Sequence, residues 1–158
     1  LLIISKNLNY ARIFGNLFQF KFIDKIYLAI CEGKPKLKES IVKLDIKTKH
    51  NKIDKTETYY KVLYYLNGIS LIIFKPKTGK THQLRKVSKN LGSPIVGDNK
   101  YNNQTNFRKE KLKLNAYKLK FTINMKNHEF YSILPEDFNL FLKKNKFKEI
   151  GKVLKLNF

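Results

Sequence analysis

The residues best suited to chemistry lie between Phe74 and Tyr101. Residues 76–85 read Pro-Lys-Thr-Gly-Lys-Thr-His-Gln-Leu-Arg and end on Arg85, one of three arginines beside thirty lysines. Where lysine is so abundant, a retained arginine marks a position that needs a planar guanidinium, which grips a carboxylate or a phosphate with two parallel hydrogen bonds. The residues alone leave two alternatives open. Arg85 either serves a site or pairs with a local acid, such as Asp98, to brace the fold.

Three other chemistries fit the sequence poorly. Gly79-Lys80-Thr81 resembles the end of a P-loop, but that motif requires a glycine where Phe74 stands. No nucleophile elbow accompanies the serines, so a Ser-His-Asp triad has no support. Metal binding is not expected either, because Cys31 and the histidines lack the spacing of metal ligands; the histidines are His50, His82 and His128.

Length and composition indicate one domain in a reducing compartment. The chain has 158 residues and one cysteine, which excludes an internal disulfide framework. The apolar run Leu1–Ile4 is too short for a signal peptide or a membrane span, so we expect a cytoplasmic protein without membrane association. The net charge of +21 predicts a nucleic-acid partner. Because the composition is typical of an AT-rich genome, which inflates lysine, an acidic membrane surface or mere solubility stay open as explanations of the charge.

The elements that must position these residues are mostly strands. Alternating or continuous apolar runs predict strands over 25–31, 40–45, 56–66, 69–74, 112–123 and 130–134, with a bulge near Tyr117. Asn67-Gly68 predicts a type I′ hairpin turn. Helices are expected over 7–18, from a Thr81 cap to Gly92, and from Pro135 to residue 142. Residues 1–5 should end a buried strand, and 47–55 should form a mobile loop. The fold class is α+β, dominated by antiparallel sheet.

Two sequence motifs resemble those of a known protein family. Residues 76–85 and the segment Leu-Gly-Ser-Pro-Ile-Val-Gly-Asp-Asn-Lys-Tyr at 91–101 resemble the C-terminal signature of the RluA-type pseudouridine synthases. Other blocks agree in order and spacing: Lys-Ile-Tyr-Leu-Ala at 25–29, Thr-Tyr at 58–59, Leu-Asn-Ala at 114–116 and Leu-Pro-Glu-Asp at 134–137. The resemblance covers residues 1 to about 143.

The resemblance implies both a fold and a reaction. The fold would be that of the pseudouridine synthases, a mainly antiparallel mixed sheet with flanking helices, incomplete at its N-terminus. Residues 1–143 would form part of the catalytic domain, and 144–158 a basic tail. These enzymes isomerise uridine in structured RNA without a cofactor, after the nucleotide is flipped from its stack. The implied partner is RNA, of the 23S ribosomal type, bound by a monomer.

The resemblance also implies roles for individual residues. Arg85 would pair with the family's catalytic aspartate and keep it ionised. Tyr27 would lie against the flipped base and serve in removing the C5 proton. RNA or pocket contacts are implied for the residues that lead into the helix, with His82 also bracing the loop; these are Lys80, Thr81, His82, Gln83 and Leu84. Structural roles are implied for Gly79, Pro94, Gly97 and Asp98, the last tying down the turn after Gly97.

The chain departs from the family in one major respect. The family's catalytic aspartate belongs to a His-Arg-Leu-Asp-x-x-Thr-Ser-Gly segment, and none of the five aspartates here has that context. We therefore expect the chain to be a piece of a synthase that is inactive alone, with Arg85 waiting for an aspartate from elsewhere. The alternative is a non-catalytic RNA-binding remnant of a degraded or split gene. Smaller departures are Lys80 in place of arginine, Asn115 in place of histidine, and Lys-Val-Ser-Lys at 86–89 where the family commonly has a more apolar helix.

Overall fold

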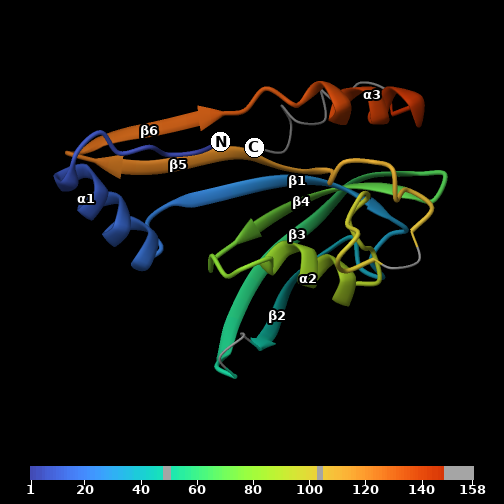
Figure 1. Ribbon diagram of the computed structural model, residues 1–158, viewed down its shortest axis with the longest axis horizontal. Coiled ribbons are helices and arrows are strands. Elements are labelled where there is room, and N and C mark those ends of the chain that lie inside the picture. The colour runs from blue at the N-terminus through green and yellow to red at the C-terminus, as the bar shows by residue number, and fades with distance from the viewer. Residues whose placement is uncertain (48–50, 103–104, 148–158) are drawn as a thin grey trace.

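A computed structural model describes residues 1–47, 51–102 and 105–147 and shows a single twisted sheet with three helices (Figure 1). The six strands lie in the order β2-β3-β4-β1-β5-β6, and every neighbouring pair is antiparallel. This confirms the α+β class, with an antiparallel rather than mixed sheet among the described residues. The strands span Asp24–Glu32 (β1), Glu39–Lys47 (β2), Ile53–Leu66 (β3), Ile69–Pro76 (β4), Leu114–Ile123 (β5) and Lys126–Tyr131 (β6).

Strand β1 lies inside the sheet and is covered on both faces. Its even-numbered residues Ile26, Leu28 and Ile30 join one core cluster, and Ala29 and Cys31 join the other. Successive side chains of a strand point to opposite faces, so a strand buried on both sides reads as a continuous apolar run. That is the pattern that predicted this strand from the sequence.

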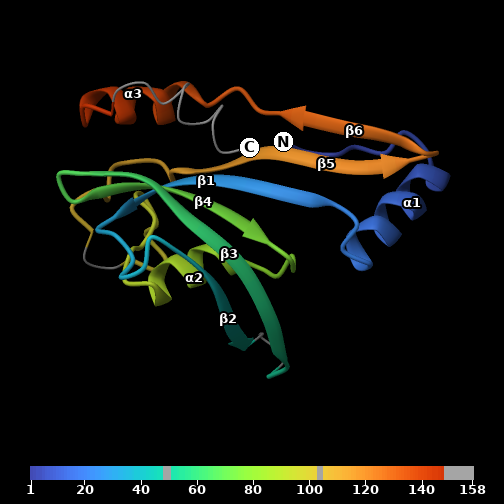
Figure 2. The ribbon, with the colours of Figure 1, turned by 180° about the vertical axis from the view of Figure 1, so that it is seen from behind.

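One helix covers each of these two core faces. Helix α2 (Gln83–Asn90) packs Leu84 and Val87 into the cluster that contains Ala29. Helix α3 (Glu136–Lys144) packs Phe138 and Phe141 into the cluster that contains Leu28. Figure 2 shows the same arrangement from behind, with α3 and α1 at opposite ends of the molecule. None of the described helices is long and apolar enough to cross a membrane.

Two local predictions about the strands are confirmed. Asn67 and Gly68 both have positive φ, 49° and 77°, as a type I′ turn between β3 and β4 requires. The pairing of β1 with β5 shifts between Ile26 and Tyr27, where the partners change from Lys118 to Ala116. Tyr117 is therefore the extra residue of a β-bulge.

The prediction that residues 1–5 end a buried strand is wrong. Both sides of β5 are already paired, with β1 and β6, so the segment runs beside the sheet as coil. Leu2 and Ile4 are exposed, and the Leu1 ammonium donates to the carbonyl oxygen of Ala116 at 3.1 Å. The apolar residues that suggested a strand do not form one.

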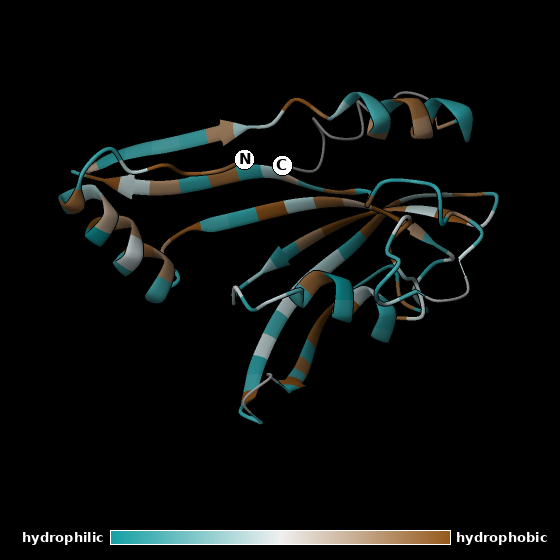
Figure 3. Ribbon diagram, in the orientation of Figure 1, coloured by the Kyte–Doolittle hydropathy of each residue, from teal (hydrophilic) through white to brown (hydrophobic). Residues whose placement is uncertain are grey.

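Three boundaries also differ from the predictions. Strand β6 begins at Lys126, earlier than the expected 130, because Asn124 and Met125 both take positive φ and form a hairpin turn without glycine. Strand β3 begins at Ile53, inside the expected loop 47–55, of which 48–50 lie outside the described residues. Helix α2 begins after His82 instead of being capped by Thr81. Figure 3 shows that β6 is largely hydrophilic, as expected of an edge strand.

The ends of the described chain pack on the sheet. Helix α1 (Leu8–Gln19) is capped by the Asn7 side chain, and its Phe14 ring meets Phe121 edge-on at 5.3 Å. Phe147 lies in the same cluster as α3 and contacts the Tyr64 ring at 5.1 Å. Phe147 of the predicted tail 144–158 therefore packs on the core, and 148–158 lie outside the described residues.

Candidate active site

A cavity of about 320 Å³ lies where β1, the end of β4 and the start of α2 meet. It brings together most of the residues singled out from the sequence; these are Tyr27, Gly79, Lys80, His82, Gln83, Leu84 and Arg85. We call this cavity the Tyr27–Arg85 pocket. Its remaining lining residues include Lys25, and none of the residues that line it carries a carboxylate.

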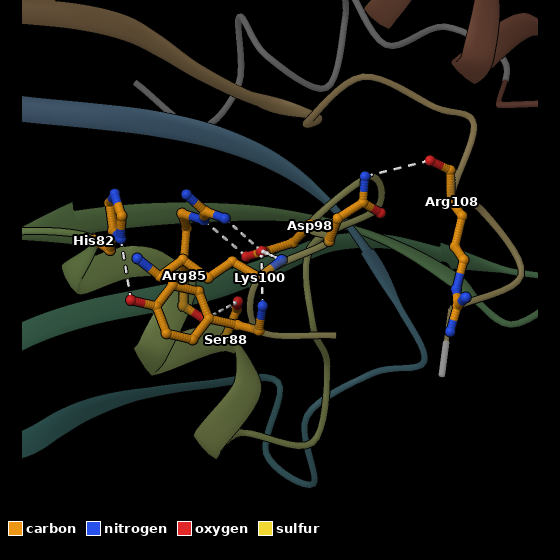
Figure 4. Close-up of polar contacts among 8 residues, drawn as sticks. His82, Arg85, Ser88, Asp98, Lys100 and Arg108 are labelled. Carbon is orange, nitrogen blue, oxygen red and sulfur yellow. Dashed lines mark hydrogen bonds and ion pairs between the residues drawn. The ribbon is translucent and has the colours of Figure 1, made fainter. Parts of the chain in front are cut away.

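Arg85 is held by a bidentate ion pair with Asp98. Its Nε donates to Oδ2 at 2.9 Å and its Nη2 donates to Oδ1 at 2.6 Å (Figure 4). The Asp98 carboxylate is buried, with 1% of its side chain exposed. The alternative in which Arg85 pairs with Asp98 to brace the fold is therefore observed, while the pairing of Arg85 with a catalytic aspartate from outside the chain stays a prediction. Arg85 still lines the pocket.

Asp98 also organises the turn that carries it. Its Oδ1 accepts hydrogen bonds from the backbone N–H groups of Lys100 and Tyr101, at 3.1 and 3.0 Å. Gly97, with φ of 75°, places this turn so close to the chain that an added Cβ would lie 2.6 Å from the Glu110 carbonyl oxygen. Only glycine fits there. The structural roles predicted for Gly97 and Asp98 agree with this geometry.

The structural role predicted for Pro94 agrees with its contacts, whereas that predicted for Gly79 has no steric support. The Pro94 carbonyl oxygen accepts from the N–H of Glu32 at 2.8 Å and so ties the second signature segment to the end of β1. Gly79 has no positive φ, and an added Cβ would meet only the Lys25 Nζ, 4.0 Å away. The structure therefore gives no steric reason for glycine at position 79.

His82 braces Tyr101, which sequence reasoning did not single out. The Nδ1 of His82 lies 3.0 Å from the Tyr101 hydroxyl, and the two rings meet edge-on. The bracing role predicted for His82 is therefore made through the side chain of Tyr101. The Arg85 guanidinium lies over the Tyr101 ring, 5.0 Å from its centroid. Burial and the nearby Arg85 charge lower the pKa of His82, so its imidazole is neutral at pH 7.

Gln83 fixes the loop that leads into α2. Its Oε1 accepts from the Lys80 N–H at 3.0 Å and the Thr78 hydroxyl at 2.8 Å, and its Nε2 donates to the Thr58 hydroxyl at 2.9 Å. The side chain is buried, which favours this bracing role over the predicted contact with RNA. Lys80 pairs with Asp54 at 2.9 Å, and Thr81 is exposed in the turn outside the pocket lining.

Tyr27 and Leu84 form the aromatic and aliphatic walls of the pocket. Tyr27 lies on β1 directly after the register shift that the bulge residue Tyr117 of β5 causes, and its side chain is half-buried. Burial raises the pKa of the Tyr27 phenol, so the ring enters the pocket uncharged at neutral pH. An uncharged ring opposite an aliphatic side chain suits contact with the flat face of a base.

Lys25 also lines the pocket, and the sequence motif that contains it gave it no role. It is 8% exposed, and no hydrogen bond or ion pair to the ammonium occurs among the described residues. Burial, only partly offset by Asp24, lowers its pKa. The signal was its spacing: on a strand, residues 25 and 27 share one face. Within the described part of the chain, no cluster of three metal-ligating side chains occurs.

The Asp98 carboxylate makes stability depend on pH. Burial alone would raise the pKa of Asp98, but the hydrogen bonds from Arg85 and from the Tyr101 and Lys100 N–H groups outweigh it and hold the pKa below its usual value. The stabilisation is therefore full above about pH 4, the usual value for Asp, and is lost as pH falls further. We expect Asp98→Asn to cost about 2–4 kcal/mol at pH 7 and progressively less below about pH 4. Urea unfolding at pH 7 and pH 3 measures this, and an unchanged difference would contradict it.

The chain resembles known proteins in both sequence and structure. The family described as RNA pseudouridylate synthase matches residues 1–90. An uncharacterized RNA pseudouridine synthase of Haemophilus influenzae is 34% identical over 158 residues, covering 95% of this chain and 70% of the relative. Ribosomal large subunit pseudouridine synthase C of Rickettsia bellii is 40% identical over 115 residues, covering 65% and 38%. Synthase D of Borreliella burgdorferi is 34% identical over 153 residues, covering 89% and 47%.

Solved structures show the same fold. The human RNA pseudouridylate synthase domain containing 4 superposes with a TM-score of 0.78 at 22% identity, covering 89% of this chain and 69% of that one. The human domain containing 1 superposes with a TM-score of 0.67 at 19% identity, covering 89% and 73%. The fold and the family match together define an RNA-modifying synthase domain. The chain belongs to the RNA pseudouridylate synthase family, in its RluA-type branch, and spans less than half the length of the Rickettsia and Borreliella relatives.

Proposed function

We propose that this chain supplies the uridine-binding part of a synthase that isomerises uridine to pseudouridine in large-subunit ribosomal RNA. The observation that carries the proposal is the make-up of the Tyr27–Arg85 pocket. It offers an aromatic wall, an aliphatic wall and a guanidinium, but no carboxylate among its lining residues. Those groups can hold a flipped base, whereas breaking its glycosidic bond needs a nucleophile or an anion that stabilises the detached sugar.

The missing carboxylate would come from the family's His-Arg-Leu-Asp segment, placed outside these 158 residues. Arg85 can receive it without releasing Asp98. Asp98 occupies Nε and Nη2, while Nη1 has no hydrogen bond within the described chain. A guanidinium carries five N–H donors, so it can serve two carboxylates. Asp98 would then fix the orientation of Arg85, and Arg85 would hold the catalytic aspartate ionised.

The pocket residues then divide the work of the reaction. Tyr27 and Leu84 hold the uracil ring after the nucleotide leaves its stack, and Tyr27 serves in removing the C5 proton once C5 has bonded to the sugar. His82, neutral and bonded to Tyr101, keeps the Arg85 side of the pocket rigid. Lys80 and the exposed Thr81 contact the RNA backbone beside the pocket. No cofactor is required for this isomerisation.

The large-subunit preference is supported by the names of the Rickettsia and Borreliella relatives. It is tested with a longer protein in which the aspartate-bearing segment precedes Leu1. Incubated with large- and small-subunit ribosomal RNA, this protein should form pseudouridine only in the large-subunit RNA, as mapped by carbodiimide modification. Equal modification of both RNAs would contradict the substrate assignment.

The second candidate is a non-catalytic RNA-binding remnant. It is favoured by the Lys80–Asp54 ion pair, which occupies a cation expected to contact RNA, and by Asn115, a buried residue whose Nδ2 lacks a hydrogen-bond partner where the family has histidine. A remnant would bind RNA but stay inactive after the aspartate-bearing segment is added. Release of tritium from RNA labelled at uridine C5 separates the two candidates.

A further inference from the structure

Strands β1 and β4 separate at one end, and two cavities meet where they do. Their pairing begins at Tyr27 opposite Phe74, so residues 24–26 of β1 pair only with β5, and the end of β4 diverges from them (Figure 1). The Tyr27–Arg85 pocket lies at this fork, and a second cavity of about 320 Å³ adjoins it. The two cavities share Lys25 and Pro76.

The second cavity is strongly basic, and we call it the lysine groove. Its charged lining is one acid, Asp24, and six lysines: Lys21, Lys25, Lys75, Lys77, Lys118 and Lys120. Lysine makes up six of its ten lining residues but thirty of the 158 residues in the chain. The high lysine content of the whole sequence therefore does not account for the groove.

Several of these ammonium groups are available to bind an anion. Lys77 pairs with Glu57 at 3.0 Å and Lys118 with Glu129 at 2.8 Å. No ion pair of Lys21, Lys75 or Lys120 occurs within the described ranges. Lys25, at the junction of the two cavities, is more than nine-tenths buried and likewise lacks a partner there. An unpaired buried charge destabilises a fold, so an external anion at this position would stabilise it.

We propose that the lysine groove binds backbone phosphates of the RNA strand next to the nucleotide held in the Tyr27–Arg85 pocket, with Lys25 contacting the strand where the two cavities join. This inference rests on the proposed function. A concave groove that opens into a base-sized pocket fits a polynucleotide, whose phosphates and bases alternate along one chain, better than the flat surface of an anionic membrane. The contacts position the strand and carry no sequence information.

The test compares two triple variants with the same loss of charge. The groove variant combines Lys21→Gln, Lys75→Gln and Lys120→Gln, all at exposed positions. The control combines Lys143→Gln, Lys144→Gln and Lys146→Gln, which lie on or just after α3. Both views show α3 well apart from the start of β1 and the end of β4 (Figures 1 and 2). Fluorescence anisotropy with a labelled single-stranded uridine-containing RNA, over a series of salt concentrations, gives the dissociation constant and its salt dependence.

We expect the groove variant to raise the dissociation constant at least about tenfold and to lower the salt slope by about 2, because each phosphate contact contributes about 0.7 to that slope. The control should change affinity only about twofold through net charge. Lys25→Met should also weaken binding, while its thermal unfolding midpoint stays equal or rises. If Lys25 only supported the fold, Lys25→Met would leave RNA binding unchanged and lower the thermal unfolding midpoint.

Three outcomes would overturn the inference, and they are distinguishable. If the unmodified chain binds no RNA, the groove and the proposed function both fail. If the groove and control variants weaken binding equally, the groove assignment fails while the proposed function stands. If the groove variant loses binding to phosphatidylglycerol vesicles but keeps its affinity for RNA, the groove serves a membrane surface instead.

Discussion

Replacing Arg85 with alanine should cost about 3–5 kcal/mol of unfolding free energy, because it leaves a buried carboxylate without its cation. The Asp98 side chain is 1% exposed and accepts both of its short hydrogen bonds from Arg85. Urea denaturation at pH 7, compared with the unmodified chain, measures the loss.

A double-mutant cycle separates this ion pair from general damage to the fold. Asp98→Ala and the combined variant complete the cycle, and we expect the combined variant to be far less destabilised than the sum of the single losses. Arg85→Lys keeps the charge but not the two-pronged geometry, so it should recover only part of the stability. A loss below about 1 kcal/mol for Arg85→Ala, as for an exposed pair, would contradict the bracing role.

Replacing Tyr27 with phenylalanine has the second large expected effect, on turnover instead of stability. In the longer protein that carries the catalytic aspartate, Tyr27→Phe should slow pseudouridine formation by roughly 10²–10⁴-fold, the usual contribution of a group that transfers a proton. Binding of RNA should be nearly unchanged, because the ring that faces the base remains. Single-turnover tritium release measures the rate.

Two further variants separate a role of Tyr27 in proton transfer from a role in contacting the base. Tyr27→Leu should lose turnover and also weaken RNA binding, since it removes the aromatic wall of the pocket. Tyr65→Phe, at an exposed position on β3, is the matched control and should leave both unchanged. If Tyr27→Phe kept full turnover, the tyrosine would serve as a wall of the pocket and take no part in moving the C5 proton.

Much of the fold could be predicted because its signals are local. A run of apolar residues buried on both faces identified β1, the Asn67-Gly68 pair identified the hairpin, and the change of alternation at Tyr117 identified the bulge. The predictions failed where strand formation depends on which strands already pair with a neighbour, and where a turn has no typical turn residue. Residues 1–5 have the composition of a strand, but β5 already has two partners, and the turn at Asn124 and Met125 contains no glycine to announce it.

The sequence predicted which residues line the pocket better than it predicted which side chains those residues contact. The family resemblance placed Tyr27, Leu84 and Arg85 around one pocket, as the structure shows. The sequence could not decide between Asp98 and an external carboxylate as the partner of Arg85, because the two residues lie thirteen positions apart in the sequence, with a turn between them. Tyr101 and Lys25 were missed for a similar reason. Their importance follows from what they touch in space: the His82 ring for one, and the fork between two strands for the other.

Tritium release from RNA labelled at uridine C5 tests most directly whether the reaction needs an outside aspartate. We expect no release above background from these 158 residues alone, because the pocket holds no carboxylate among its lining residues. We expect release once the His-Arg-Leu-Asp segment precedes Leu1, and loss of that release when the aspartate of the segment is changed to asparagine. Turnover by the 158 residues alone, or by the asparagine variant, would contradict the claim that the reaction depends on an aspartate supplied from outside them.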